Sequence, residues 1–134
     1  MSCIVVGYVP KPEGRAALRR AAEEACLRNA RLVVVSSHRG GRVSDADEPV
    51  ASDDQLQEVR RQLDEAGVEY EVRQLIPGTD PADDLIAVAE DVAAEFIVIG
   101  LRRRTSVGKL ILGNNAQRVL LDARCPVLAV KAVE

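Results

Sequence analysis

The stretch FIVIGLRRRTSVGKLILGNNAQRVLL, residues 96–121, decides the fold class. Its apolar start, residues 96–99, is typical of a buried strand, and we expect Gly100 to end that strand. A basic loop that begins with residues 102–104 is expected next, followed by Gly113 and an Asn helix cap. Apolar residues then recur at the helical spacing i, i+3, i+4, i+7, namely Ala116, Val119, Leu120 and Ala123.

This order of strand, glycine, cationic loop, glycine and helix favours an anion site. A glycine at a strand end permits close approach to the backbone, and a helix start offers free N–H groups and a positive dipole end. With arginines nearby, phosphate is the typical ligand. The alternative is structural: Gly113 permits a tight turn, Asn114 caps the helix and the arginines are solvated. The stretch is not a P-loop, because Arg103 and Leu110 stand where glycine and Ser/Thr are required.

Length and composition bound the rest of the interpretation. The 134 residues predict one domain, 1–134, and the net charge of -3 gives no support for nucleic-acid binding. No apolar run approaches the roughly 20 residues of a membrane span, and no signal peptide is evident, so we expect a cytoplasmic protein away from the membrane. Cys3, Cys26 and Cys125 are expected to be buried thiols, and His38 stands without a metal-binding companion.

Strands and helices are predicted to alternate along the whole chain. The chain is expected to start with the strand Cys3–Tyr8, a proline-containing turn at residues 9–14 and a helix from Arg15 to Asn29. A strand at 30–37, a loop at 38–51 and a helix at 53–66 are expected next. The remaining expected elements are an edge strand at 68–76, a helix from Asp80-Pro81, and a last strand at 126–131. Such alternation predicts an α/β fold with a five-stranded parallel sheet covered on both faces, Rossmann-like or flavodoxin-like. Ligands of such sheets bind beyond the carboxyl ends of the strands, where the strand order reverses.

The signature region resembles the universal stress protein family. After the fourth strand, ATP-binding members carry a glycine, two residues of any type, a second glycine, nine residues of any type, and then Gly-Ser or Gly-Thr. In this chain Gly100 and Gly113 match the first and the last glycine of that pattern. Arg103 replaces the second glycine, and Asn114 replaces the Ser. The segments IVVGY and PEGRAALRRAAEEA near the start, GTDPADDLIAVAE at residues 78–90, and CPVLAV at 125–130 are also similar to the family, so the resemblance covers nearly the whole chain.

The resemblance implies a fold and a site. The fold is a three-layer sandwich of the adenine nucleotide alpha hydrolase-like type with strand order 3-2-1-4-5, which makes the loops 9–14 and 102–113 face each other. Val9 stands where the family has an adenine-contacting Asp, and Val35 matches a Val of the adenine pocket. The implied ligand is ATP or another adenine nucleotide, with Mg²⁺ as a candidate companion. The implied nucleotide-binding residues are Val9, Pro10, Val35, Ile99, Gly100, Arg102, Arg103, Gly113, Asn114 and Asn115.

Two functional hypotheses follow. The first is a non-enzymatic stress protein with an altered adenine-nucleotide site; the second is a scaffold of the same fold with a closed site that acts through protein partners. The missing carboxylate at Val9 favours the second, and the spacing from Gly100 to Gly113 favours the first. An enzyme is the third alternative, for which no catalytic set is apparent. Family members often pair their last strands, so a homodimer through residues 126–131 is expected.

Overall fold

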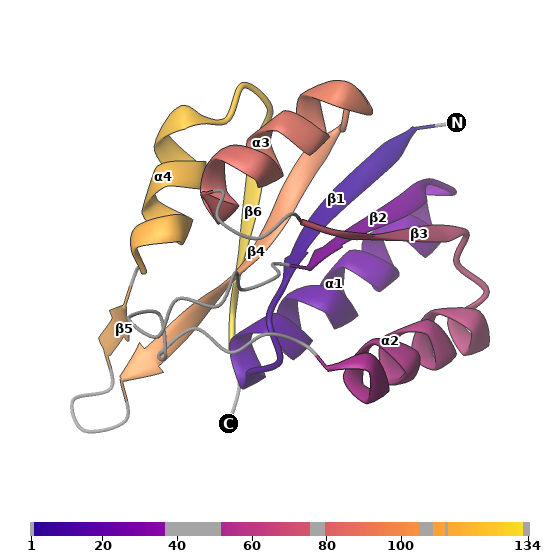
Figure 1. Ribbon diagram of the computed structural model, residues 1–134. Coiled ribbons are helices and arrows are strands. Elements are labelled where there is room, and N and C mark those ends of the chain that lie inside the picture. Colours follow the sequence, from indigo (N-terminus) through magenta and orange to yellow (C-terminus); the bar gives the residue numbers. More distant parts are fainter. Residues whose placement is uncertain (1, 37–51, 76–79, 105–108, 112, 133–134) are drawn as a thin grey trace.

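The computed structural model describes residues 2–36, 52–75, 80–104, 109–111 and 113–132. Its centre is a sheet in which five of six strands run parallel (Figure 1). Across the sheet these five are β3 (Tyr70–Gln74), β2 (Arg31–Ser36), β1 (Cys3–Tyr8), β4 (Phe96–Arg104) and β6 (Val127–Lys131). The predicted order 3-2-1-4-5 is confirmed, with β6 as the fifth parallel strand. At Tyr70–Gln74 the predicted edge strand is confirmed too.

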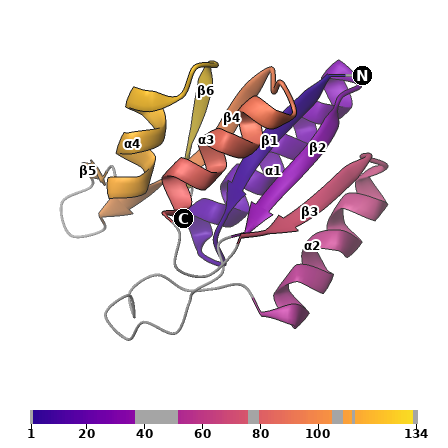
Figure 2. The same cartoon turned by 45° about the horizontal axis from the view of Figure 1, so that its top comes forward.

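Helices cover both faces of this sheet (Figure 2). The helices α1 (Pro12–Arg28) and α2 (Asp53–Ala66) lie on one face, and α3 (Pro81–Asp91) and α4 (Asn114–Asp122) lie on the other. Side chains of a strand point alternately to the two faces. On β4, Phe96 and Val98 therefore join the core under α1 and α2, whereas Ile97 and Ile99 join the core under α3 and α4.

One strand continues beyond its predicted end. Gly100 was expected to close the fourth strand, but β4 runs on to Arg104, and its last residues pair antiparallel with the short strand β5 (Lys109–Ile111). Arg103 faces Leu110 in this pairing. The prediction of a basic loop at 102–104 was wrong. These residues pair through the backbone with residues 109–111, and the change from apolar to polar residues in the sequence does not indicate such pairing.

Two helix starts also differ from the sequence interpretation. The helix α1 begins at Pro12 rather than Arg15, since a proline is well placed in the first helical turn. The helix α4 has Gly113 as its N-cap, so Asn114 is the first helical residue and not the cap. On α4, Leu120 is 38% exposed and does not belong to the buried side. The expectation that all three cysteines are buried was wrong: Cys26 is exposed, and Cys3 and Cys125 are half-buried.

Other local signals were interpreted correctly. Asn29 ends α1 in the left-handed conformation, and Gly67 does the same for α2 with a φ of 73°. Asp80 caps α3 by accepting hydrogen bonds from two backbone N–H groups. Among the described helices, none combines the length and the apolar character that a membrane crossing requires. The loop predicted at 38–51, with His38, lies outside the described residues.

Candidate functional site

A pocket of about 120 Å³ lies at the carboxyl ends of β1, β2 and β4. It is located where the sheet order reverses: β1 is flanked by β2 on one side and by β4 on the other, so the connections leave in opposite directions. The start of α1 contributes to its rim, and α3 and α4 contribute the wall opposite the sheet. The lining residues are Gly7, Tyr8, Val9, Glu13, Gly14, Val35, Leu75, Pro81, Ala82, Leu85, Ile99, Gly100, Asn115, Ala116 and Val119.

Half of the predicted site residues line this pocket. They come from four elements or their ends and are Val9, Val35, Ile99, Gly100 and Asn115. Segments some ninety positions apart in the sequence thus meet at one cavity, as the predicted topology requires. The pocket is mostly apolar, and its volume is below the roughly 300–1,000 Å³ usual for ligand pockets. It therefore suits a part of a nucleotide, such as the flat base, rather than the whole molecule.

The remaining predicted residues lie outside the lining. Arg102 is exposed, and one of its terminal guanidinium nitrogens, Nη2, lies 3.5 Å from the position that a Cβ on Gly113 would take. The guanidinium is therefore beside the start of α4, where free N–H groups also attract anions. Asn114 is exposed in the first turn of α4, and Pro10 is half-buried between β1 and α1. The side chain of Arg103 lies outside the described part of the structure.

Two glycines of the site serve packing between α1 and the strands. A Cβ on Gly100 would lie 2.1 Å from the backbone oxygen of Glu13, and a Cβ on Gly14 would lie 1.8 Å from the backbone oxygen of Val9. Neither separation can be accommodated, because both contacts involve backbone atoms. The first turn of α1 can thus approach the ends of β1 and β4 only because these positions are glycines. The sequence interpretation had assigned Gly100 to close approach of a ligand.

Sequence reasoning missed the charged member of the pocket. Glu13 is half-buried and is the only charged side chain among the described lining residues. It was interpreted as part of a turn, because Pro10 and Pro12 precede it within the same short segment. A Pro-Glu pair is a usual helix start, with the proline in the first turn and the carboxylate near the positive end of the dipole. That signal could have placed Glu13 at the start of α1 and hence beside the strand ends.

The wall formed by α3 and α4 is held by ionic contacts. Arg118 of α4 donates hydrogen bonds to the carboxylates of Asp80 and Asp83 at the start of α3. Asp80 Oδ1 also accepts a hydrogen bond of 2.9 Å from the backbone N–H of Ala82, a lining residue. Asp83 lies in the first turn of α3, where the helix dipole also favours a negative charge. These contacts join the start of α3 to the middle of α4 at the pocket wall.

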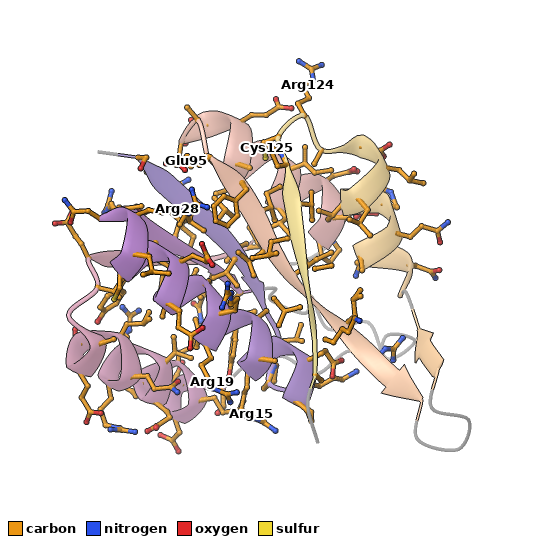
Figure 3. All side chains as sticks on the ribbon, turned by 180° about the vertical axis from the view of Figure 1, so that it is seen from behind. Arg15, Arg19, Arg28, Glu95, Arg124 and Cys125 are labelled. Carbon is orange, nitrogen blue, oxygen red and sulfur yellow. The ribbon has the colours of Figure 1, made fainter. Side chains whose placement is uncertain are left out.

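The opposite end of the molecule carries a separate ionic network. Arg28 donates to Glu24 at 3.0 Å and to Glu95 at 3.3 Å, and its guanidinium carbon lies 5.1 Å from the centre of the Phe96 ring (Figure 3). Glu24 is 8% exposed and also pairs with Arg20 at 2.7 Å. Each charge has a described partner, so the network ties α1 to the start of β4. It stabilises the fold and does not form part of the pocket.

The groups that can act chemically at the pocket are few. Burial raises the pKa of the Tyr8 phenol, and the nearby positive charge of Arg15 opposes that shift only in part, so Tyr8 stays protonated at neutral pH. Within the described residues, no three His, Cys, Asp or Glu side chains gather in a way that could hold a metal ion. The described pocket offers an apolar slot and one acidic residue, and Arg102 lies beside Gly113 at the start of α4, a helix that contributes to the pocket wall. This arrangement is suited to binding.

A parallel, doubly covered sheet with a pocket at its switch point defines a protein of the Rossmann-like fold class. Comparison with known proteins narrows the class. The model of the universal stress protein family matches residues 1–131. A universal stress protein of Mycolicibacterium smegmatis is 42% identical over 128 residues, covering 96% of each chain.

Solved structures are similar over the same extent. A universal stress protein from Archaeoglobus fulgidus has a TM-score of 0.77 at 36% identity and 98% coverage of both chains. One from the same organism in complex with dAMP has a TM-score of 0.71 at 31% identity, again with 98% of both chains covered. This chain therefore belongs to the universal stress protein family.

Proposed function

We propose that the protein is a non-enzymatic universal stress protein that binds an adenine nucleotide in the pocket between β1 and β4. The observation that carries the proposal is the convergence of Val9, Val35, Ile99, Gly100 and Asn115 on one apolar cavity at the switch point. The base would occupy this cavity. The phosphate would lie at its rim, beside Arg102 and the start of α4.

The dAMP complex of the A. fulgidus relative supports an adenine nucleotide as the ligand class. The departures from the family signature affect the affinity for the nucleotide rather than the class of ligand. Val9 supplies no carboxylate, so a hydrogen bond to the adenine amino group worth roughly 1 kcal/mol is lost unless another acceptor replaces it. Arg102 compensates on the phosphate side, because a guanidinium can bind phosphate through two N–H groups.

The experiment has two parts. The protein is purified without added nucleotide and denatured, and any released small molecule is identified by mass spectrometry. AMP, dAMP and ATP are then titrated by calorimetry, with and without Mg²⁺. Saturable heat at micromolar to sub-millimolar nucleotide supports the proposal, whereas no released nucleotide and no heat up to several millimolar would refute it.

A pocket-filling variant locates the binding. Ala116 lines the cavity from α4, and Ala116→Leu places a larger side chain there without disfavouring the helix. We expect a loss of affinity of at least about tenfold, because the added atoms occupy the volume of the base. Gln117→Leu is the matched control, since Gln117 is the exposed neighbour on the same helix. Equal affinities of the two variants would place the ligand elsewhere.

The second candidate is a dimeric scaffold whose pocket stays empty. It is favoured by the small cavity volume and by the open edge of β6. Among the described strands β6 pairs with β4 alone, and residues 127–130 are half-exposed and apolar. Such an edge favours pairing with a second chain. Sedimentation at micromolar concentration tests the homodimer: a dimer mass that Ala129→Pro converts to a monomer mass would support β6 pairing, and a monomer mass of the unaltered chain would refute it.

A further inference from the structure

Glu13 is placed in the pocket by contacts that leave its backbone little freedom. Its carbonyl oxygen and Cβ lie 2.1 and 3.0 Å from the position that a Cβ on Gly100 would take. Glu13 is a lining residue of the cavity, and it forms no ion pair or side-chain hydrogen bond with another described residue. A half-buried carboxylate without such a partner is available to a ligand.

The chemistry of a carboxylate restricts that ligand group. An ionised carboxylate only accepts hydrogen bonds, and it repels phosphate. The groups that it can recognise on an adenine nucleotide are therefore donors: the amino group of the base and the hydroxyls of the ribose. Acidic side chains bind ribose hydroxyls in other Rossmann-like folds for the same reason.

Position along the sheet distinguishes between these donors. Val35 lies near the end of β2, and Val9 follows the end of β1. Glu13 packs beside Gly100 on β4, and Arg102 comes two residues further along the same strand. Strands are about 4.8 Å apart and residues about 3.3 Å apart along a strand. The order of apolar slot, carboxylate and guanidinium therefore matches the order of base, ribose and phosphate over the length of one nucleotide.

We propose that Glu13 is a specificity-determining residue that accepts hydrogen bonds from the ribose hydroxyls of the bound nucleotide. The inference rests on the proposed adenine-nucleotide function and deepens it. The site then prefers a ribonucleotide to a nucleotide that lacks both ribose hydroxyls, because the latter leaves the carboxylate half-buried and unpartnered. A hydrogen bond to a charged group contributes enough to change affinity by about tenfold or more.

The test compares AMP with 2′,3′-dideoxy-AMP by calorimetric titration of three proteins. The unaltered chain is expected to bind AMP at least about tenfold more tightly. Glu13→Gln, which keeps the size of the side chain, is expected to reduce this preference to less than about threefold while dideoxy-AMP binds as well as before. Glu23→Gln is the control, since Glu23 lies on the same helix, is exposed and pairs only with Arg20 among the described residues, at 3.3 Å. The Glu23→Gln variant should prefer AMP to dideoxy-AMP as strongly as the unaltered chain does.

Three results would overturn the inference, and they are distinguishable. Equal binding of AMP and dideoxy-AMP by the unaltered chain removes the role of Glu13 while leaving nucleotide binding intact, and this arm needs no variant to fold. A uniform loss for both ligands in Glu13→Gln, together with a lower unfolding temperature, assigns Glu13 to stabilisation of the α1 start. Failure of the folded, unaltered chain to bind either nucleotide refutes the proposed function itself.

Discussion

Replacing Gly100 by alanine tests whether this signature glycine serves the fold or the ligand. The new Cβ would lie 2.1 Å from the backbone oxygen and 2.6 Å from the backbone carbon of Glu13, so either α1 or β4 must move. Overpacking of this kind costs about 1–3 kcal/mol, and the upper end applies because the clash is with backbone rather than with a flexible side chain. We therefore expect Gly100→Ala to lower the free energy of unfolding by about 3 kcal/mol.

Gly113→Ala is the matched control within the same signature. Its Cβ would meet only the Arg102 guanidinium, at the ordinary contact distance of 3.5 Å, and the residue has a φ of -65° that alanine adopts freely. Alanine is a slightly poorer N-cap than glycine, so a cost of no more than about 1 kcal/mol is expected. The two variants should thus differ by about 2 kcal/mol although both remove a signature glycine.

Unfolding in guanidinium chloride, followed by circular dichroism, measures the difference in unfolding free energy between Gly100→Ala and Gly113→Ala. Equal m-values check that both variants unfold from a comparable native state. In a thermal scan, a loss of 3 kcal/mol corresponds to about 10 °C for a chain of this size. Equal stability of Gly100→Ala and Gly113→Ala would refute the packing argument. If Gly100→Ala kept full stability but lost nucleotide affinity, close approach of the ligand would be the reason for that glycine.

Further predictions concern the helix cap, the buried phenol and the thiols. Asp80→Ala should cost about 1 kcal/mol or more in the free energy of unfolding, because two backbone N–H groups of α3 lose their acceptor, and more than Asp83→Ala, which removes only an exposed ion pair. Burial raises the pKa of Tyr8 above its usual value of 10, so the unfolded chain loses this proton at lower pH than the folded chain. Stability should therefore fall as the pH rises above about 10, and Tyr8→Phe should reduce that fall in a series of melting curves. Cys26 is exposed, whereas burial raises the pKa of the half-buried Cys125 thiol, so a thiol reagent at pH 8 should modify Cys26 first, and Cys26→Ser should remove the fastest phase.

Regular local patterns in the sequence were sufficient to predict the strands and helices, whereas the sheet order was implied by the family resemblance. Apolar runs and helical spacing identified each parallel strand and each helix, and the end signals at Asn29, Gly67 and Asp80 were interpreted correctly. The β4–β5 hairpin was missed because its pairing depends on contacts between residues 102–104 and 109–111 that no single-residue preference announces. The start of α1 was misplaced because a proline is compatible both with a turn and with a first helical turn.

Prediction of the site was limited by the same kind of ambiguity. Val35 and Ile99 could be assigned to the site because the family resemblance implied them, and both line the pocket. Glu13 could not be placed there while its segment was interpreted as a turn. Arg102 was expected in a basic loop, yet the structure places it in a strand beside Gly113. The misplaced start of α1 accounts for the first difference, and the missed pairing of β4 with β5 accounts for the second.

The packing role of Gly100 changes how the signature should be interpreted. A residue required by contacts within the fold is retained whether or not a nucleotide binds, so Gly100 and Gly14 carry little information about the ligand. The informative positions are those that the fold leaves free. Glu13 lines the cavity without a described partner, and Arg102 is exposed at its rim, so the fold alone explains neither side chain. Variants at these two charges, rather than at the glycines, therefore separate a nucleotide-binding protein from a scaffold of the same architecture.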